Sequence, residues 1–232
     1  MTMGVACSRQ TGSIHADRGS PCQDYVAGFY DSSRALAVVA LADGAGSYRY
    51  SAAGAKAAVE AVLAYFRVHS TITDRQAFVA MVSRAVEQED PLNADVGTTL
   101  LFAAVTERGF VAGHIGDGVI LMRQKGQFSV LSRPENGEHL WETYLLPCWE
   151  DSARFRFYEG REAEGFLLAS DGIASQLYEE SGRGCPACEK LYRWSIQMTG
   201  EDFHRTVEAN FEGVFAKYSS DDKSLAVLWT EQ

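Results

Sequence analysis

Hydrophobic and polar positions along the chain predict many strands. The run 35–42 is continuously apolar, as in a strand that is buried on both faces. The segment 154–158 alternates instead, with Phe155 and Phe157 on one face and arginines on the other. The predicted strands are 25–30, 35–42, 98–106, 110–115, 119–123, 127–131, 154–158, 166–169 and 225–229. Short turns at 107–109 and 125–126 join two pairs of them into expected hairpins.

Helical periodicity predicts three helices and part of a fourth. Ser51–Val68 is rich in alanine, a strong helix former. The segment 74–88 begins with a capping aspartate and continues with apolar residues at helical spacing. The segment 201–218 carries a stripe of phenylalanine and valine. The region 175–199 is expected to be helical only in part, because glycines and a proline interrupt it.

The order of these elements predicts the fold class. Strands come first, then two helices, many strands, further helices and a last strand, which is an α+β order with antiparallel hairpins. A chain of 232 residues suits one large domain or two small ones. The stretch 132–152 has weak periodicity, several charges and two tryptophans, and we interpret it as a flap outside the sheets.

Charge and cysteine content narrow the partners and the compartment. The formal net charge of −10 should repel nucleic-acid phosphates and anionic membrane surfaces, while it leaves cation binding open. No apolar stretch approaches the roughly 20 residues of a membrane-spanning helix. The odd count of five cysteines and the lack of a secretory signal favour a cytoplasmic location.

Aspartates recur at the ends of the predicted strands. Three apolar runs end in an Asp-Gly pair, and two further acidic positions come just before a strand. These residues are Asp24, Asp43, Asp117, Asp171 and the pair Asp221 and Asp222. Mg²⁺ and Mn²⁺ prefer carboxylate, carbonyl and water oxygens as ligands. Two such ions about 4 Å apart activate a water and stabilise an in-line phosphoryl displacement.

Each Asp-Gly pair also has a purely structural explanation. Asp-Gly is a common turn sequence, so Asp117 and Gly118 could simply turn a hairpin. Asp43 could cap the helix that follows it. The set and its order along the chain, rather than any single pair, favour a metal site.

Six short motifs in this order resemble the protein phosphatase 2C family of metal-dependent serine/threonine phosphatases. They are Pro-Cys-Gln-Asp at 21–24, Ala-Asp-Gly-Ala-Gly at 42–46, Gly-Thr-Thr at 97–99, Gly-Asp-Gly at 116–118, Ser-Asp-Gly at 170–172 and Asp-Asp-Lys-Ser at 221–224. The stretch 135–143 resembles the compact bacterial branch of that family.

The resemblance implies a fold and a set of ligands. The fold would be a four-layer α/β/β/α sandwich of two antiparallel sheets flanked by helices, formed by one catalytic domain over residues 1–232. Two or three Mn²⁺ or Mg²⁺ ions would be the cofactors. The catalytic core would be Asp43, Asp171 and Asp222, and the metal ligands would be Asp24, Asp43, the Gly44 carbonyl, Asp117, Asp171 and Asp222.

The resemblance also implies a reaction and its partners. A metal-bound hydroxide would attack the phosphorus of phosphoserine or phosphothreonine without a phosphoenzyme. The partners would be phosphorylated proteins, including the targets of a cognate kinase, with no nucleic acid and no membrane.

The chain departs from the family at several positions. Many members carry a phosphate-binding arginine where this chain has Gly19, so Arg18 and His15 are the candidates for that role. Animal members have a histidine, a candidate acid, where this chain has Ala45. Lys223 stands where members of the family commonly have an asparagine. A non-catalytic phosphoprotein-binding or regulatory module of the same fold is therefore the alternative, and hydrolysis of a small phosphorylated metabolite is a third hypothesis.

One further motif lies outside this pattern. Cys185 and Cys188 have the spacing of a CxxC pair. Coincidental surface thiols are favoured over a redox pair, and zinc is the least favoured, because a structural zinc site usually needs four ligands.

Overall fold

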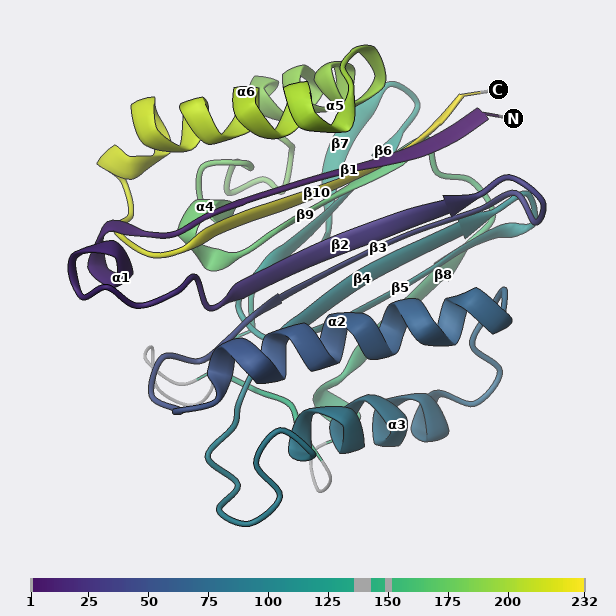
Figure 1. The fold of residues 1–232 in the computed structure, drawn as a ribbon. Helices are drawn as coiled ribbons and strands as arrows, with labels where there is room; N and C mark the ends of the chain where they lie inside the picture. Colours follow the sequence, from purple (N-terminus) through teal and green to yellow (C-terminus); the bar gives the residue numbers. More distant parts are fainter. Residues whose placement is uncertain (1, 136–142, 149–151, 232) are drawn as a thin grey trace.

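Two antiparallel sheets form the centre of the computed structural model, which describes residues 2–135, 143–148 and 152–231 (Figure 1). Each sheet has five strands within these ranges. The first has the order β1 (Thr2–Gln10), β10 (Lys223–Glu231), β9 (Gly165–Ala169), β6 (Val119–Gln124) and β7 (Gln127–Ser132). The second has the order β2 (Asp24–Asp31), β3 (Leu36–Asp43), β4 (Leu100–Thr106), β5 (Gly109–Ile115) and β8 (Arg156–Gly160).

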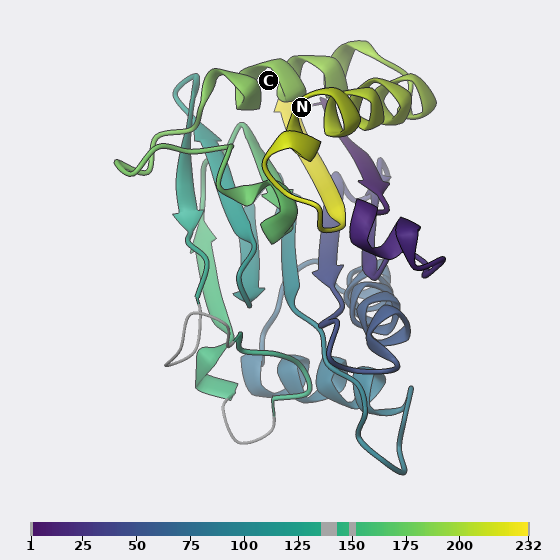
Figure 2. The ribbon, with the colours of Figure 1, turned by 90° about the vertical axis from the view of Figure 1, so that its left-hand side faces the viewer.

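Helices cover the outer face of each sheet, so the molecule has four layers (Figures 1 and 2). The first sheet is covered by α5 (Pro186–Gln197) and α6 (Gly200–Gly213), and the second by α2 (Ser51–Val68) and α3 (Arg75–Glu87). The shorter segments are α1 (Ser13–Asp17), α4 (Asp171–Ala174) and the 3₁₀ turns Ser152–Arg154 and Phe215–Lys217. The predicted α/β/β/α sandwich is confirmed.

The apolar run of β3 is explained by the two layers that it separates. Val38 and Ala40 belong to the hydrophobic cluster beneath α2 and α3. Val39 and Leu41 belong to the cluster between the two sheets. Because successive side chains of a strand point to opposite faces, a strand with an apolar layer on each side needs an apolar residue at every position.

Several elements agree with the sequence prediction, and some differ. The helix Ser51–Val68 has the predicted bounds. Asp74 caps α3, and its side chain accepts a hydrogen bond of 2.9 Å from the backbone N–H of Ala77. Helix α6 ends at Gly213 rather than near 218, because the chain turns into the 3₁₀ segment Phe215–Lys217.

The pattern did not predict β1. The strand pairs along its length with β10, from Thr2 opposite Glu231 to Gln10 opposite Lys223. Its buried side chains are mostly small or polar, and Met3 is the one large residue among them. Backbone hydrogen bonds to β10 and packing beneath α6 stabilise this strand, so its sequence does not need a strongly apolar pattern.

The flap interpretation falls partly on residues 136–142 and 149–151, which lie outside the described residues. The segment 143–148 is attached to the body of the protein. Leu146 is fully buried and exchanges backbone hydrogen bonds of 2.8 and 3.2 Å with Thr98. The flap as a unit stays a prediction. Within the described ranges, no helix combines the length and the apolar character that crossing a membrane requires.

Removing the ring of Phe102 should destabilise the protein strongly. Phe102 is fully buried, and its ring lies 5.9 Å from that of Phe66 and 5.3 Å from that of Phe78, centroid to centroid. We expect Phe102→Ala to lower the free energy of unfolding by about 3–5 kcal/mol in urea denaturation. The control Leu92→Ala, at a side chain that is 91% exposed, should change it by less than about 0.5 kcal/mol. Equal effects of the two variants would contradict this account of the core.

Candidate active site

The strand order brings the aspartates to one end of the sandwich, where α1 and α4 lie in Figure 1. In the first sheet β10, β9 and β6 are neighbours, so the acidic residues at the start of β10, after β9 and before β6 lie side by side. In the second sheet Asp24 and Asp43 are paired directly across β2 and β3. The two groups meet at the same end of the two sheets.

A cavity of about 520 Å³ opens between these groups. Four aspartates line it, and each comes from a different part of the chain. They are Asp43, Asp117, Asp171 and Asp221. His15 from α1 and Gly44 also lie on the wall. The sequence prediction that distant acidic residues meet in one place is therefore consistent with the fold for most of its members.

Asp43 is fixed by the Gly-Thr-Thr segment. The backbone N–H of Asp43 donates to the hydroxyl of Thr99 at 2.9 Å. Its carbonyl accepts from the N–H of Thr99 at 2.8 Å and from the hydroxyl of Thr98 at 2.9 Å. At Gly44 a Cβ atom would lie 2.6 Å from the backbone of Ser51, so only glycine fits. Two of the sequence motifs thus form one rigid unit.

Asp24 is a buried carboxyl group that no hydrogen bond of good geometry satisfies. It is 1% exposed, and the hydroxyls of Ser224 and Ser170 are near its carboxyl oxygens without reaching ideal hydrogen-bond geometry. Its pKa is raised to about 7, mainly by burial; the hydroxyls of Ser224 and Ser170 lower it, and the charges of Asp222 and Asp171 raise it. A buried acceptor that nothing satisfies is costly unless it is protonated or meets a cation.

The neighbouring carboxyl groups are perturbed in the same direction. Burial raises the pKa of Asp43 well above its usual range, and the charges of Asp24, Asp171 and Asp117 add to the effect. Burial also raises the pKa of Asp171 to about 6, while a hydrogen bond with Asp43 lowers it. Carboxyl groups that repel one another in this way are stabilised by protons or by divalent cations.

Asp222 is not among the residues that line the cavity. One carboxylate oxygen accepts from the N–H of Gly12 at 2.7 Å, and the other accepts from the N–H of Gln23 at 2.6 Å. The second oxygen also lies 3.0 Å from Nδ1 of His15. The sequence prediction made Asp222 a catalytic ligand, whereas in the structure its oxygens are occupied by protein groups.

The adjacent Asp221 takes the position on the cavity wall. Its charge adds to the burial that raises the pKa of Asp171, and both residues line the same cavity. Tight backbone packing fixes this register, because a Cβ atom on Gly172 would lie 2.0 Å from the carbonyl oxygen of Asp222. A Cβ atom on Gly12 would lie 2.2 Å from the backbone of Asp221. Asp221 was named in the sequence only as part of an acidic pair.

The two candidates for binding a phosphate differ in position. His15 is mostly buried and lines the cavity, whereas Arg18 is exposed and lies outside the lining. Thr143, which the sequence did not single out, donates a hydrogen bond of 2.6 Å to Asp117. Lys223 is buried beside the cluster, and its Nζ donates to the carbonyl of Asp221 at 2.7 Å.

The carboxylates fit hydrated cations better than a closed cage. Across the described ranges no three His, Cys, Asp or Glu side chains stand together at the spacing of metal ligands. The carboxylate oxygens instead surround a cavity. The buried, poorly satisfied Asp24 and the raised pKa values of Asp24 and Asp43 indicate that this cavity lacks positive charge. Mg²⁺ usually keeps several waters and binds directly through only one or two carboxylates.

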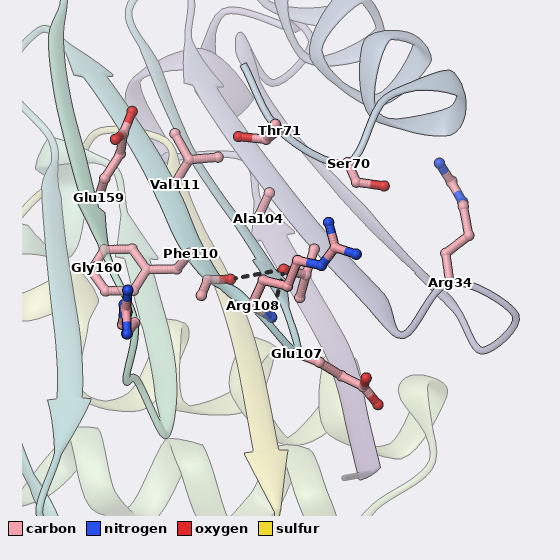
Figure 3. Close-up of a pocket in the computed structure, with 13 residues that line it drawn as sticks. Arg34, Ser70, Thr71, Ala104, Glu107, Arg108, Phe110, Val111, Glu159 and Gly160 are labelled. Carbon is pink, nitrogen blue, oxygen red and sulfur yellow. Dashed lines mark hydrogen bonds between the residues drawn. The ribbon is translucent and has the colours of Figure 1, made fainter. Parts of the chain in front are cut away.

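A larger cavity of about 740 Å³ lies at the opposite end of the sandwich (Figure 3). Arg34, Glu107, Arg108 and Glu159 are spread around its opening rather than directed toward one another. Arg34 is already held by an ion pair of 2.7 Å with Asp31. The charged side chains around the larger cavity are of both signs and do not converge on one point where a substrate could bind. The carboxylate-lined cavity is therefore the candidate site.

The structure is an α/β/β/α sandwich with acidic residues gathered at one end of its two sheets. A comparison with protein-family models identifies the family, because the model described as protein phosphatase 2C matches residues 11–210. The chain belongs to the protein phosphatase 2C family. No curated protein sequence matches the chain.

Solved structures of bacterial phosphatases share the fold. The Mycobacterium tuberculosis serine/threonine phosphatase PstP/Ppp has a TM-score of 0.69 and 19% identity, with 100% of each chain covered. The Staphylococcus aureus serine/threonine phosphatase has a TM-score of 0.69 and 16% identity, covering 100% of this chain and 96% of that one. The S. agalactiae serine/threonine phosphatase has a TM-score of 0.69 and 15% identity, covering 99% of this chain and 100% of that one.

The metal-free protein should lose stability as the pH rises through the acidic range. In the unfolded chain Asp24 ionises near pH 4, whereas in the fold it holds its proton up to about pH 7. Its contribution is therefore fully present below about pH 4 and is lost as the pH rises to about 7. We expect Asp24→Asn to remove this loss, which is on the order of 2–4 kcal/mol.

Urea denaturation in the presence of a chelator at pH 5 and at pH 7.5 measures this difference. The exposed Asp17→Asn serves as the matched control and should follow the native protein. An Asp24→Asn variant that loses as much stability over this pH range as the native protein would contradict the assignment.

Proposed function

We propose that this chain is a Mn²⁺- or Mg²⁺-dependent protein serine/threonine phosphatase that hydrolyses phosphoserine and phosphothreonine in cytoplasmic proteins. The observation that supports the proposal most is the cavity lined by four aspartates, with the poorly satisfied carboxyl group of Asp24 buried beside it. Neighbouring carboxyl groups whose pKa values are raised together are a common mark of a functional site.

The proposal assigns the metal ligands as the sequence predicted them, with one exchange. Asp43, the Gly44 carbonyl, Asp171, Asp117 and Asp24 would hold two or three cations. Asp221 takes the place given to Asp222, because Asp221 lies on the cavity wall. When bound, the cations supply the positive charge that the carboxylates lack and activate a water for attack on phosphorus.

Asp222 receives a different role in this proposal. It accepts hydrogen bonds from the backbone N–H groups of Gly12 and Gln23. One of its oxygens lies 3.0 Å from Nδ1 of His15, so its negative charge stands beside the His15 ring at the cavity. His15 is then the residue that would donate a hydrogen bond to the substrate phosphate, in place of the arginine that the family carries where this chain has Gly19. A carboxylate that orients a histidine is a recurring device in active sites.

The alternative is a non-catalytic phosphoprotein-binding module of the same fold. The absence of the family arginine and of a histidine at Ala45 favours it. The clustered carboxyl groups argue against it, because they cost stability and a binding module has no use for them. A third hypothesis, hydrolysis of a phosphorylated metabolite, differs only in substrate, and a panel of phosphopeptides and metabolites would separate it.

Hydrolysis of an aryl phosphate should depend on the cation and on Asp43. We expect Mn²⁺ to be required, and Asp43→Asn to lower kcat by about 100-fold or more, because a carboxylate that binds cations is lost. The matched control is Asp74→Asn, which makes the same change at an exposed helix cap. Activity that survives complete chelation would rule out the metal mechanism. Phosphopeptide binding without turnover at any cation concentration would favour the non-catalytic module.

The two adjacent aspartates should behave differently when each is replaced. Asp221→Asn should weaken Mn²⁺ binding by about 10-fold or more with little effect on folding, since a carboxylate on the cavity wall is lost. Asp222→Asn should lower the free energy of unfolding by about 1–3 kcal/mol and raise KM, because amide groups and His15 lose a charged acceptor. Calorimetric titration with Mn²⁺ and urea denaturation measure both. The reverse pattern would return the ligand role to Asp222.

A further inference from the structure

Two cysteines share the first turn of α5. Cys185 is the N-cap residue, Pro186 is the first helical residue, and Cys188 lies three residues after Cys185. The backbone N–H of Cys188 donates to the carbonyl of Cys185 at 2.9 Å, which closes the turn. Turns closed in this way hold their first and fourth Cα atoms within about 7 Å. A disulfide needs a Cα separation of about 4.4–6.8 Å, so the backbone is already shaped for one.

The two thiols differ in access. Cys188 is fully buried in the hydrophobic cluster beneath α5 and α6, whereas Cys185 is partly exposed. Burial raises the pKa of Cys188 to about 12, and the charge of Cys185 adds to the effect. One accessible thiol beside one protected thiol is the arrangement in which the first attacks a reagent and the second resolves the product.

Both cysteines are held by the same backbone carbonyl. The N–H of Cys185 donates to the carbonyl of Leu177 at 2.8 Å. The thiol of Cys188 donates to that same carbonyl at 3.1 Å. The carbonyl keeps its backbone hydrogen bond if the thiol hydrogen is removed, so forming a disulfide leaves no buried acceptor without a partner.

Neither a structural metal site nor apolar packing explains why both cysteines stand on this turn. A structural metal site needs further ligands, and the described part of the chain supplies no third His, Cys, Asp or Glu at ligand spacing. Apolar packing explains the buried Cys188, yet it does not explain a partly exposed cysteine on the same turn. Cys7 and Cys22 have no second cysteine on their own turn or strand, and burial raises the pKa of each to about 12.

We propose that Cys185 and Cys188 form a reversible modification site, a dithiol that a low-molecular-weight disulfide oxidises to an internal disulfide. The Cys185 sulfur, as a thiolate, attacks one sulfur of the reagent and releases the other as a thiolate. Cys188 loses its proton and attacks the Cys185 sulfur, which releases the second half of the reagent as a thiolate. The protein loses two electrons and two protons, and the reagent becomes two thiols.

The bond would act as a marker of oxidation rather than as a structural support. It closes a loop of only a few residues, so it removes little entropy from the unfolded chain. In a reducing compartment such a bond is transient. The site is independent of phosphate hydrolysis, and a failure of the proposed phosphatase activity would leave it untouched.

Alkylation mapped by mass spectrometry tests the proposal on the intact chain. Samples are equilibrated in buffers with rising ratios of oxidised to reduced glutathione, quenched with acid, unfolded and alkylated. We expect Cys185 and Cys188 to lose alkylation together, with the loss of two hydrogen atoms from one peptide, and to regain it in excess reduced glutathione. Cys7, Cys22 and Cys148 should remain alkylated throughout.

Two variants separate an internal disulfide from simple adduct formation. Cys188→Ser should accumulate a glutathione adduct on Cys185, because nothing resolves it, whereas Cys185→Ser should leave Cys188 unmodified. Circular dichroism checks that each variant folds, and if one does not, the alkylation pattern of the native protein decides. The proposal is overturned if the native protein stays reduced under conditions that oxidise a free Cys-Pro-Ala-Cys peptide. It is equally overturned if the native protein keeps a stable glutathione adduct on Cys185.

Discussion

Repulsion among buried carboxylates is the constraint on which the rest of the structure depends. Aspartates from distant parts of the chain gather at one end of the two sheets, and burial and mutual charge raise the pKa values of Asp24, Asp43 and Asp171. Such a cluster opposes folding, so the apolar layers on both sides of each sheet must offset it. The same unfavourable charge density makes the cavity attractive to divalent cations. The repulsion that opposes folding is therefore also the property that would let the cavity bind cations.

The sandwich keeps the cluster in place through backbone contacts rather than through salt bridges. Thr98 and Thr99 fix the peptide groups on both sides of Asp43. Gly12 and Gly172 allow the segment that carries Asp221 to approach so closely that no side chain fits between. The backbone positions that these peptide groups fix at Asp43 and Asp221 do not depend on the protonation of the carboxylates.

The sequence predicted most of the framework because the framework follows from periodicity. The run from Leu36 to Ala42 in β3 is apolar at every position and predicts a buried strand, and the alanine-rich sequence of α2 predicts a helix. Strand β1 was not predicted, because its pairing with β10 relies on backbone groups that the side-chain pattern does not reveal. The Asp-Gly positions predicted residues that line the candidate cavity. They could not distinguish Asp221 from Asp222, because a shift of one residue turns a side chain to the opposite side and both residues are acidic.

The pairing of β1 with β10 has a consequence for synthesis on the ribosome. Residues 2–10 find their partner only when residues 223–231 have left the exit tunnel, and α1 cannot be anchored until Asp222 is available to Gly12. The second sheet, with α2 and α3, can form much earlier from segments that are close in sequence. The acidic end of the sandwich is therefore completed last, and an interrupted chain would hold an exposed sheet without a competent cavity.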